Sequence, residues 1–346
     1  MINKDFLFSI IVPVYNTEKY IEKSLNSILK AIKEDCEVII INDGSTDNSE
    51  KKINEFLEKL PSKLKNNFVY TKKENKGLAD TKNVGLDMAH GKYISVVDSD
   101  DCIRDDFYDI ARRYIDDYDM IIYDVYVVFE KDKKLNYISR AKQDYKENDM
   151  VAILNGAISG SSCNKIIKKE LYNGYRFPVG KQYEDTAVTP FIISDANKIK
   201  YVPYPMYYYL QREKSIVATN TYMSAFYKIC ENISEVLRKD NKDMEKYKYV
   251  INEFFADRIL DILTQELNEN KDEMNDNLQK FSNNNKEVLN YIIDSNMIYT
   301  IENHYSERQK KLVVEIIEDL KNNNSKNVVK VLKIRKIINK LRSIRR

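Results

Sequence analysis

The sequence predicts an α/β protein whose mostly parallel sheet is flanked by helices and followed by an all-α C-terminal region. In the first hundred residues, short apolar runs rich in β-branched side chains alternate with segments of helical periodicity. This is the pattern of a parallel sheet covered by helices. From about residue 222 onward, nearly every segment has helical spacing of its apolar residues. We therefore expect a mixed α/β domain over 1–220, a helical region over 221–324 and a separate tail over 325–346.

The predicted elements follow in order along the chain. Buried strands are expected at FLFSIIVPVY, CEVIIIND, NFVYTK and KYISVVD. Three helices are expected between them. The first follows a cap at Thr17 and runs to about Ile32, the second passes through Ile53 to Leu60, and the third covers 78–89. The second half is predicted to contain strands at 119–129 and 198–210, and helices near 147–156 and 186–194. Ligands of such sheets bind beyond the carboxyl ends of the strands.

Composition excludes several kinds of site. With 346 residues, 43% of them hydrophobic and 32% charged, the chain can bury a sizeable core. Its four cysteines are far apart in sequence, as ordinary reduced thiols are. Only two histidines occur, so any metal must be held by oxygen ligands. No stretch reaches the length of a membrane span, and we expect a cytoplasmic protein.

Charge is unevenly distributed along the chain. Residues 325–346 contain nine Lys or Arg and no Asp or Glu, whereas the whole chain has a net charge of +2, so the remainder is acidic. The tail alternates these cations with apolar residues at helical spacing, which favours a helix lying on an anionic membrane surface. A terminal helix docked on the protein, or one that mediates oligomerisation, is the alternative. Nucleic acid is not an expected partner of an acidic body.

The run Asp98-Ser99-Asp100-Asp101 follows a predicted buried strand. Carboxylates that are crowded and partly desolvated repel one another, and a divalent cation would relieve that cost. Mg²⁺ and Mn²⁺ prefer one or two carboxylates together with phosphate oxygens, so the run suits a nucleoside diphosphate. The alternative is a solvated turn that caps a helix beginning near Arg104.

Four segments, IIVPVYN, VIIINDGSTDNS, ENKGLADTKNVGL and KYISVVDSDD, occur in an order and spacing that closely resemble family 2 glycosyltransferases, inverting enzymes of GT-A fold. Two later segments, SCNKIIKKELYNGYRFPVGKQYEDT and YYYLQREKSI, resemble bacterial members that build or decorate cell-surface polysaccharides and teichoic acids. The resemblance implies a nucleotide-sugar-binding half over 1–101 and an acceptor half over 102–220. The region after residue 222 matches no motif.

The resemblance also implies donor-binding roles. Pro13 and Tyr15 would line the base pocket, with the phenol ring stacked on uracil, unless Tyr15 is simply the end of a core strand. Asp43 would accept a hydrogen bond from the pyrimidine, a role compatible with forming a turn. Asn83 would shape the helix over the nucleotide. Lys82 stands where the family usually has arginine; it keeps the charge but loses the bidentate fork.

Within the acidic run, the resemblance places Asp98 near the ribose, with Ser99 among the donor-binding residues. Asp100 would ligate the Mn²⁺ or Mg²⁺ that bridges the diphosphate. Asp101 is expected to orient its neighbours or to cap the next helix. The metal would neutralise charge that develops on the leaving diphosphate.

Transfer with inversion also needs a carboxylate that takes the acceptor's proton. The resemblance assigns this role to Asp185, with Glu184 beside it, although an acidic pair is also favoured at any helix N-terminus. Arg212 and Ser215 would close over the diphosphate. Lys165 is expected either to position acceptor or phosphate, or to face solvent.

The resulting hypothesis is an inverting, non-processive enzyme that moves a sugar from a UDP-sugar to a hydroxyl of a surface polysaccharide, teichoic acid or lipid-linked precursor. One alternative is a sugar-nucleotide-binding or membrane-scaffolding module of the same fold. A nucleotidyltransferase would need a glycine-rich loop where this chain has VPVYNTEKY. The helical region could be an acceptor platform or could form a homo-oligomer.

Overall fold

The computed structural model describes residues 6–131, 135–138, 160–212, 222–239, 241–256, 258–269, 272–300 and 305–344. The chain forms two compact units, Met1–Thr219 and Asn220–Arg346, each of which has its own core. The helix predicted near 147–156 and Ser215 lie outside the described residues.

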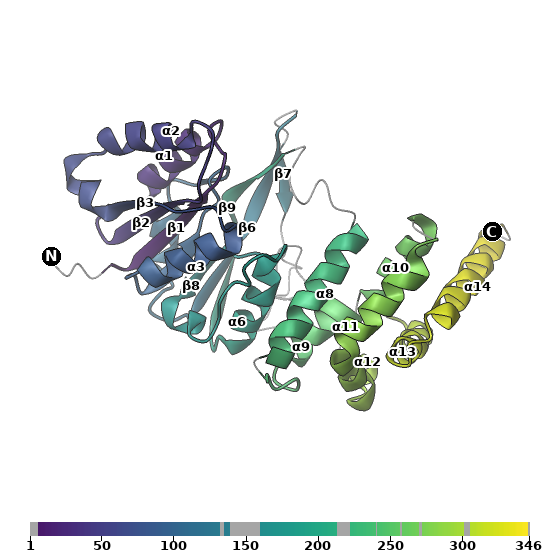
Figure 1. Ribbon diagram of the computed structural model, residues 1–346. Coiled ribbons are helices and arrows are strands. Elements are labelled where there is room, and N and C mark those ends of the chain that lie inside the picture. Colours follow the sequence, from purple (N-terminus) through teal and green to yellow (C-terminus); the bar gives the residue numbers. More distant parts are fainter. Residues whose placement is uncertain are drawn as a thin grey trace. The chain divides into compact units, whose positions relative to one another are not determined.

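The first unit is built on one nine-stranded sheet (Figure 1). Its strand order is β3-β2-β1-β4-β8-β6-β9-β5, with β7 paired to β6. The strands are β1 (Phe8–Val14), β2 (Cys36–Asn42), β3 (Phe68–Lys72), β4 (Tyr93–Val96), β5 (Cys102–Ile103), β6 (Met120–Phe129), β7 (Leu135–Ile138), β8 (Lys165–Lys168) and β9 (Ile199–Gln211). All of the strands predicted from the sequence form.

The sheet is parallel over β3, β2, β1 and β4, as predicted, and mixed beyond β4. The change of direction comes from β8, a four-residue strand that pairs antiparallel with both β4 and β6. Its sequence, KIIK, is too short and too polar at its ends to stand out as a strand. β6 and β9 then pair in parallel along most of their length.

Helices cover both faces of the parallel half. On one face, α1 (Ile21–Ala31), α2 (Ser49–Glu58) and α4 (Phe107–Ala111) enclose a core with the side chains of β1 and β2. On the other side lie α3 (Leu78–Met88) and α6 (Thr189–Asp195) (Figure 1). Here α3 approaches β1 closely, because a Cβ at Gly85 would lie 2.4 Å from Ile11 Cγ2. Short 3₁₀ turns complete the unit: η1 (Ser62–Asn67), η2 (Lys169–Tyr172) and η3 (Glu184–Ala187).

The N-terminal cap predicted for α1 is wrong. The Thr17 side chain does not bond a helix N–H; its Oγ1–H donates to Ser99 Oγ at 3.1 Å. The Thr17 carbonyl instead accepts from the N–H groups of Tyr20 and Ile21, so a turn leads into the helix. The hydroxyl therefore joins the loop after β1 to the loop after β4.

The second unit is helical, as predicted. Its elements are α8 (Tyr222–Lys239), α9 (Lys248–Ile251), the π-helical turn η4 (Asn252–Ala256), α10 (Ile259–Glu269), α11 (Met274–Asp294), α12 (Met297–Thr300), α13 (Glu307–Lys321) and α14 (Ser325–Ile344). Rings of Phe226, Phe255 and Phe281 meet in its core. No helix among the described residues is both long enough and apolar enough to cross a bilayer.

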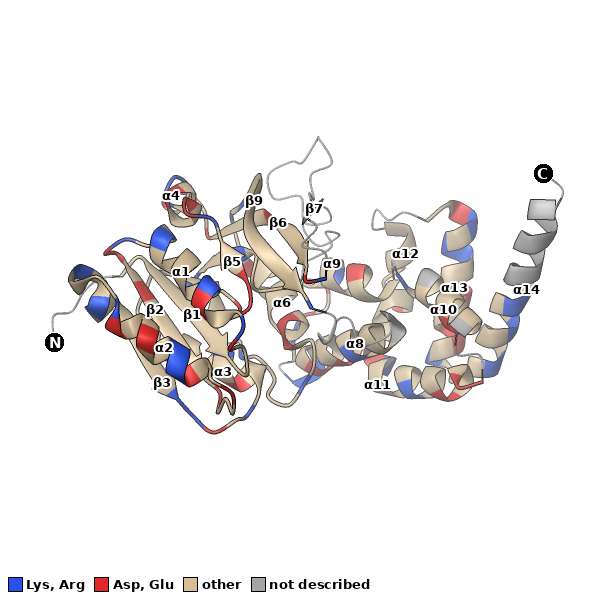
Figure 2. Cartoon of the chain, turned by 90° about the horizontal axis from the view of Figure 1, so that it is seen from above, with Lys and Arg blue, Asp and Glu red and all other residues tan. Residues whose placement is uncertain are grey.

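The basic tail forms α14, along which Figure 2 shows Lys and Arg but no acidic residue. Its first part packs on α10, α11 and α13, with Val328 and Leu332 buried. Ser325 Oγ–H donates to Asn275 Oδ1 at 2.6 Å and strengthens this attachment. The start of the tail is thus a docked helix.

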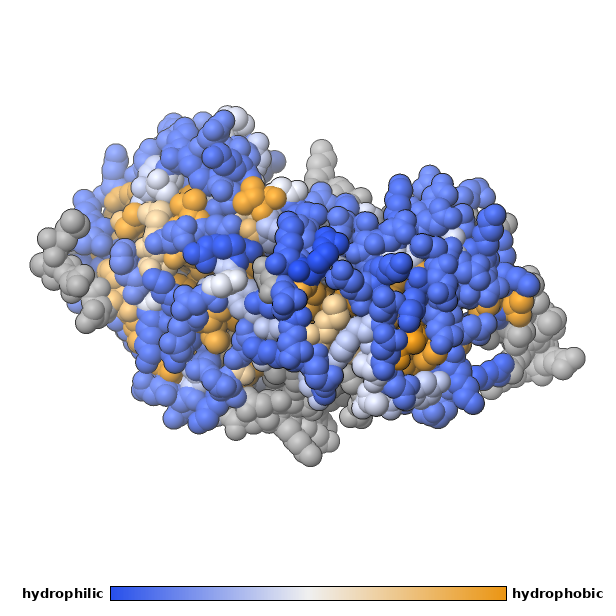
Figure 3. Space-filling model, turned by 60° about the horizontal axis from the view of Figure 1, so that its bottom comes forward, coloured by the Kyte–Doolittle hydropathy of each residue, from blue (hydrophilic) through white to orange (hydrophobic). Residues whose placement is uncertain are grey.

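On the molecular face drawn in Figure 3, apolar residues lie in separate groups among hydrophilic ones.

Candidate functional site

The parallel register brings three predicted donor-binding positions to one edge of the sheet. β1 pairs with β2 on one side and with β4 on the other, so the segments that follow these strands begin side by side. Tyr15 directly follows β1 and Asp43 directly follows β2, whereas one residue separates Asp98 from the end of β4. The Tyr15 side chain is 49% exposed, as a stacking platform must be, whereas Pro13 is buried within β1.

Asp43 holds the loop between β3 and α3. Its carboxylate accepts the backbone N–H of Lys76 at 3.0 Å and that of Gly77 at 2.8 Å, and it also pairs with the Lys73 ammonium. Gly77 has φ +90°, a left-handed conformation that glycine adopts readily. Asp43 is only 3% exposed. The structure therefore shows a loop-forming carboxylate, and the predicted contact with a pyrimidine stays a prediction.

The acidic run is partly buried, and burial raises the pKa values of all three of its carboxyls, Asp98, Asp100 and Asp101. Burial, which outweighs the Lys82 charge, raises the pKa of Asp98 to about 7, and the charges of Asp100 and Asp185 add to the rise. Burial also raises the pKa of Asp100 against the effect of Arg212. The Asp98 N–H donates to the Tyr207 hydroxyl at 3.1 Å, which ties the run to β9.

Asp101 orients the run and does not cap a helix. The Tyr207 hydroxyl donates to its Oδ2 at 2.8 Å, and the Leu210 N–H donates to its Oδ1 at 2.7 Å. The run continues into the short strand β5, and the next helix, α4, begins at Phe107 with Asp106 before it. The capping prediction for Asp101 is therefore wrong, because β5 and a turn separate it from that helix.

Arg212, just after β9, pairs with Asp100. Its Nε lies 2.9 Å from Asp100 Oδ2, and its guanidinium stands 5.6 Å from the ring centroid of Tyr20. The Tyr20 hydroxyl in turn donates to Glu130. The predicted metal ligand and the predicted diphosphate ligand thus contact each other directly. Among the residues that the structure describes, no three His, Cys, Asp or Glu side chains are grouped so as to hold a metal ion.

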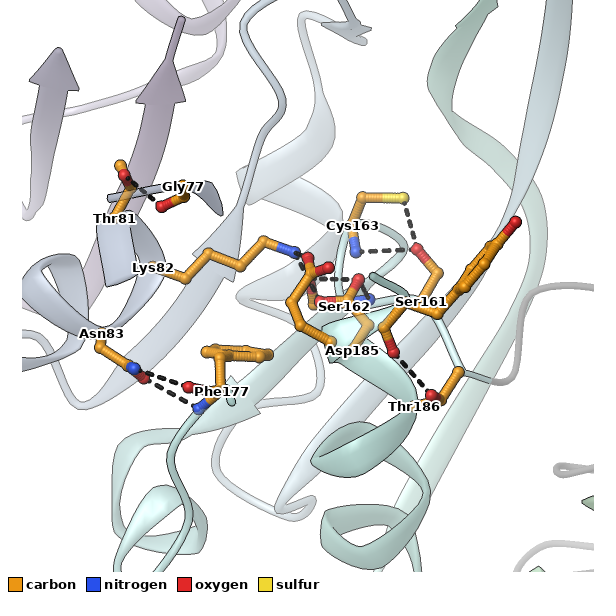
Figure 4. Close-up of polar contacts among 12 residues, drawn as sticks. Gly77, Thr81, Lys82, Asn83, Ser161, Ser162, Cys163, Phe177, Asp185 and Thr186 are labelled. Atoms are coloured by element: carbon orange, nitrogen blue, oxygen red, sulfur yellow. Dashed lines mark hydrogen bonds and ion pairs between the residues drawn. The ribbon is translucent and has the colours of Figure 1, made fainter. Parts of the chain in front are cut away.

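The predicted general base meets a buried lysine (Figure 4). Lys82 on α3 is 2% exposed, and its Nζ lies 2.9 Å from Glu184 Oε1 and 2.5 Å from Asp185 Oδ1. Burial alone would lower the pKa of Lys82, but the two carboxylates outweigh it and raise that pKa well above its usual value. The ammonium is also 5.2 Å from the Phe177 ring centroid. Lys82 therefore engages the acidic pair, while its predicted contact with the donor stays a prediction.

Ser162 completes the surroundings of Asp185. Its N–H and its hydroxyl both donate to Asp185 Oδ2, at 3.0 and 3.1 Å. The sequence analysis did not single out this residue, because SSCNK looks like an ordinary polar loop. The only available signal was a polar cluster directly before the strand β8.

Two other predicted residues, Asn83 and Lys165, make contacts within the protein. Asn83 exchanges two hydrogen bonds with the Phe177 backbone, at 2.8 and 2.9 Å, so it anchors the loop before η3 to α3. Lys165 neither faces solvent nor reaches an open surface. It is 1% exposed, and its ammonium donates to the Ser161 carbonyl at 2.6 Å and to Asn164 Oδ1 at 2.7 Å. Its expected contact with acceptor or phosphate is therefore not supported.

Comparison with known proteins identifies the family. The sequence model of glycosyl transferase family 2 matches residues 9–176. Glycosyltransferase GlyG of Streptococcus pneumoniae serotype 4 is 32% identical over 62% of this chain and 73% of its own length. The chain belongs to glycosyl transferase family 2. This confirms the family that the four sequence motifs predicted. The protein is therefore a glycosyltransferase.

Other relatives of this glycosyltransferase agree. Poly(ribitol-phosphate) β-N-acetylglucosaminyltransferase TarS of Staphylococcus aureus is 31% identical over 69% of this chain and 42% of its own length. The crystal structure of TarS 1–349 in complex with UDP-GlcNAc has a TM-score of 0.70 at 22% identity and covers 96% of this chain and 92% of that one. The likeness confirms the predicted fold. The roles of individual site residues stay predictions.

Proposed function

We propose that this glycosyltransferase transfers one sugar at a time, with inversion, from a UDP-sugar to a hydroxyl of a surface polysaccharide, a teichoic acid or a lipid-linked precursor. The observation that carries the proposal is the meeting of Lys82, Asp185 and Glu184 with the acidic run that follows β4. Asp185 lies near enough to Asp98 for its charge to raise the pKa of that residue. This proximity supports a common site for the proposed base and the proposed donor, beyond the carboxyl ends of the parallel strands, where such sheets bind ligands.

The proposed reaction is a single displacement. The acceptor hydroxyl oxygen bonds to the anomeric carbon while its proton passes to Asp185. The bond from the anomeric carbon to the diphosphate breaks at the same time, and its electron pair leaves with UDP. Asp185 then releases the proton to solvent. Attack opposite the leaving group inverts the anomeric configuration.

The oxygen atoms of the acidic run suit a divalent cation whose remaining ligands come from the substrate's phosphates. Asp100 and Asp98 offer the oxygen ligands that Mn²⁺ and Mg²⁺ prefer, and Mg²⁺ commonly combines one or two carboxylates with substrate phosphates. We propose Asp100 as the protein ligand. When bound, the cation would supply a positive charge that stabilises the leaving diphosphate. Arg212 would exchange Asp100 for a phosphate oxygen, and Ser215 is proposed as a second contact of the diphosphate.

The donor and acceptor classes rest on the relatives. TarS is named for transfer of N-acetylglucosamine to poly(ribitol phosphate) and was crystallised with UDP-GlcNAc. Minor teichoic acid biosynthesis protein GgaB of Bacillus subtilis is 27% identical over 85% of this chain. We propose Tyr15, Pro13 and Asp43 for the uracil side of the donor, and Asp98 and Ser99 for its ribose side. We propose that Asn83 positions the loop that precedes the general base, Asp185.

The basic tail and the helical region suggest further partners. A cytoplasmic enzyme could meet a lipid-linked acceptor if the distal part of the basic tail 325–346 touched an anionic membrane surface. The helical region 221–324 could serve as an acceptor platform or pair with a second copy. A nucleic-acid partner is not proposed.

The test is release of UDP from a panel of UDP-sugars, with and without EDTA. We expect turnover of at least one donor, its loss in EDTA and its return with Mn²⁺ or Mg²⁺. Asp185→Asn should lower kcat about 10²- to 10⁴-fold, the contribution typical of a general base. Asp87→Asn, at an exposed carboxylate on α3, is the matched control. Donor binding without turnover would instead identify a binding module, and metal-independent turnover would remove the metal from the proposal.

A further inference from the structure

We infer that Ser162 is a positioning residue for the general base. It orients the Asp185 carboxylate so that one lone-pair site on Oδ1 remains for the hydroxyl of the acceptor substrate. This inference rests on the proposed function, because it assumes that Asp185 takes the proton. It concerns a residue from a different segment of the chain, which enters the site only through the fold (Figure 4).

The hydrogen bonds of Asp185 are unequally divided between its two oxygens. Oδ2 accepts both the N–H and the hydroxyl of Ser162, at 3.0 and 3.1 Å. Oδ1 accepts the Lys82 ammonium. A carboxylate has about four lone-pair sites, so three of them are occupied. No further donor to this side chain is found within the described parts of the chain, and 19% of it is exposed. The remaining site, on Oδ1, is therefore the one left for a substrate hydroxyl.

Two donors from one residue on a single oxygen also fix the rotation of the carboxylate. Lys82 alone would allow the group to turn about its Cβ–Cγ bond, because an ammonium is a point charge with rotatable donors. The paired contact from Ser162 removes that freedom. The backbone just before the acidic pair is constrained as well, since Tyr183 adopts φ +57°, which is uncommon for a residue other than glycine.

Lys82 and Glu184 set the charge next to the base. The Lys82 ammonium contacts both Asp185 and Glu184, so the two side chains share one positive charge. The titratable groups facing Asp185 are Lys82 from α3, Asp98 after β4, Glu184 beside it, Cys163 next to Ser162, and Tyr172 from η2. Burial raises the pKa values of Cys163 and Tyr172, which stay neutral.

Two substitutions should then move the acidic limb of the kcat/KM pH profile in opposite directions. Ser162→Ala removes a hydrogen bond to the charged form, so the limb should move to higher pH. Glu184→Gln removes a nearby negative charge, so the limb should move to lower pH. Both should lower kcat, Ser162→Ala by about tenfold or more, as expected for a hydrogen bond to a charged group. A merely structural role predicts no such pair of shifts.

Controls make the outcome decisive. Ser161→Ala alters the neighbouring hydroxyl, which contacts Cys163, and should keep the parent profile. Ser162→Thr keeps the hydroxyl and should recover most of kcat, and Ser162→Cys is a near-isosteric replacement in case the alanine variant does not fold. The inference is overturned if Ser162→Ala, or the Cys variant in its place, folds and keeps the parent kcat and profile. It is also overturned if kcat falls without any shift of the limb. An active Asp185→Asn would refute the proposed base itself, whatever Ser162 does.

Discussion

Lys82 and Asp185 lie 103 positions apart in the chain, yet the ammonium of one contacts the carboxylate of the other within the protein interior. Glu184 contacts the same ammonium, with its Oε1 2.9 Å from Lys82 Nζ. This contact joins the half of the sheet that carries the donor-site motifs to the half that carries the proposed base. One cation thereby links the two parts of the proposed active site.

The first prediction concerns removal of that cation. Lys82→Met should destabilise the protein by about 3–5 kcal/mol, because it leaves two carboxylates buried together without a counter-charge. Urea denaturation measures the change in the free energy of unfolding. Lys51→Met is the control: Lys51 pairs with Glu55 at the surface, its side chain is 73% exposed, and its loss should cost less than about 1 kcal/mol. Equal effects of the two substitutions would contradict the buried role of Lys82.

The second prediction concerns the ion pair between Arg212 and Asp100. Arg212→Ala should tighten binding of Mn²⁺ in the absence of donor, because a competing positive charge 2.9 Å from the carboxylate is gone. The same substitution should raise KM for the UDP-sugar, since the proposed phosphate contact is lost. Metal titration by calorimetry and steady-state kinetics test the two parts. Arg104→Ala, which breaks a pair with Asp106 elsewhere, should change neither. Weaker Mn²⁺ binding in Arg212→Ala would refute the competition.

The third prediction concerns the close packing of α3 on β1. Gly85→Ala should destabilise the protein by about 1–3 kcal/mol, because its Cβ would lie 2.4 Å from Ile11 Cγ2. The helix also carries Lys82, so activity should fall with stability. In the double variant Gly85→Ala with Ile11→Ala, the loss should be smaller than the sum of the single losses, because the clashing methyl is absent. Additive losses would place the strain elsewhere.

The fourth prediction is a pH dependence. Burial by itself would raise the pKa of Asp35, but hydrogen bonds and charge from Arg112 outweigh it and lower that pKa below its ordinary value. A carboxylate with a depressed folded-state pKa stabilises the protein above its unfolded pKa, and this stabilisation is lost as the pH falls through the folded value. Asp35→Asn should therefore be less stable than the parent at pH 7, and the difference should shrink below about pH 4. Urea denaturation across this range measures it, and a difference that does not change with pH would count against the ion pair.

The sequence was most informative where a local pattern determines a local structure. Buried β-branched runs predicted β1, β2, β3 and β4, and four motifs in order identified the family. Short elements were missed: β8 has four residues and β5 has two, too few for any periodicity. The cap assigned to Thr17 failed because its hydroxyl found a partner on a distant loop, Ser99.

By itself, the sequence determined the fold class, the glycosyltransferase family and the residues expected to carry the chemistry, because each of these is written in contiguous motifs. Only the tertiary structure decided which of those residues contact one another. Lys82 meets Asp185 and Glu184, Arg212 meets Asp100, and Ser162 holds the proposed base, through strands and helices that are far apart in the chain. The physical reason is that burying a charge is costly unless it is paired, and the partner can come from any segment that the sheet places nearby. That choice depends on topology and register, which no single motif encodes.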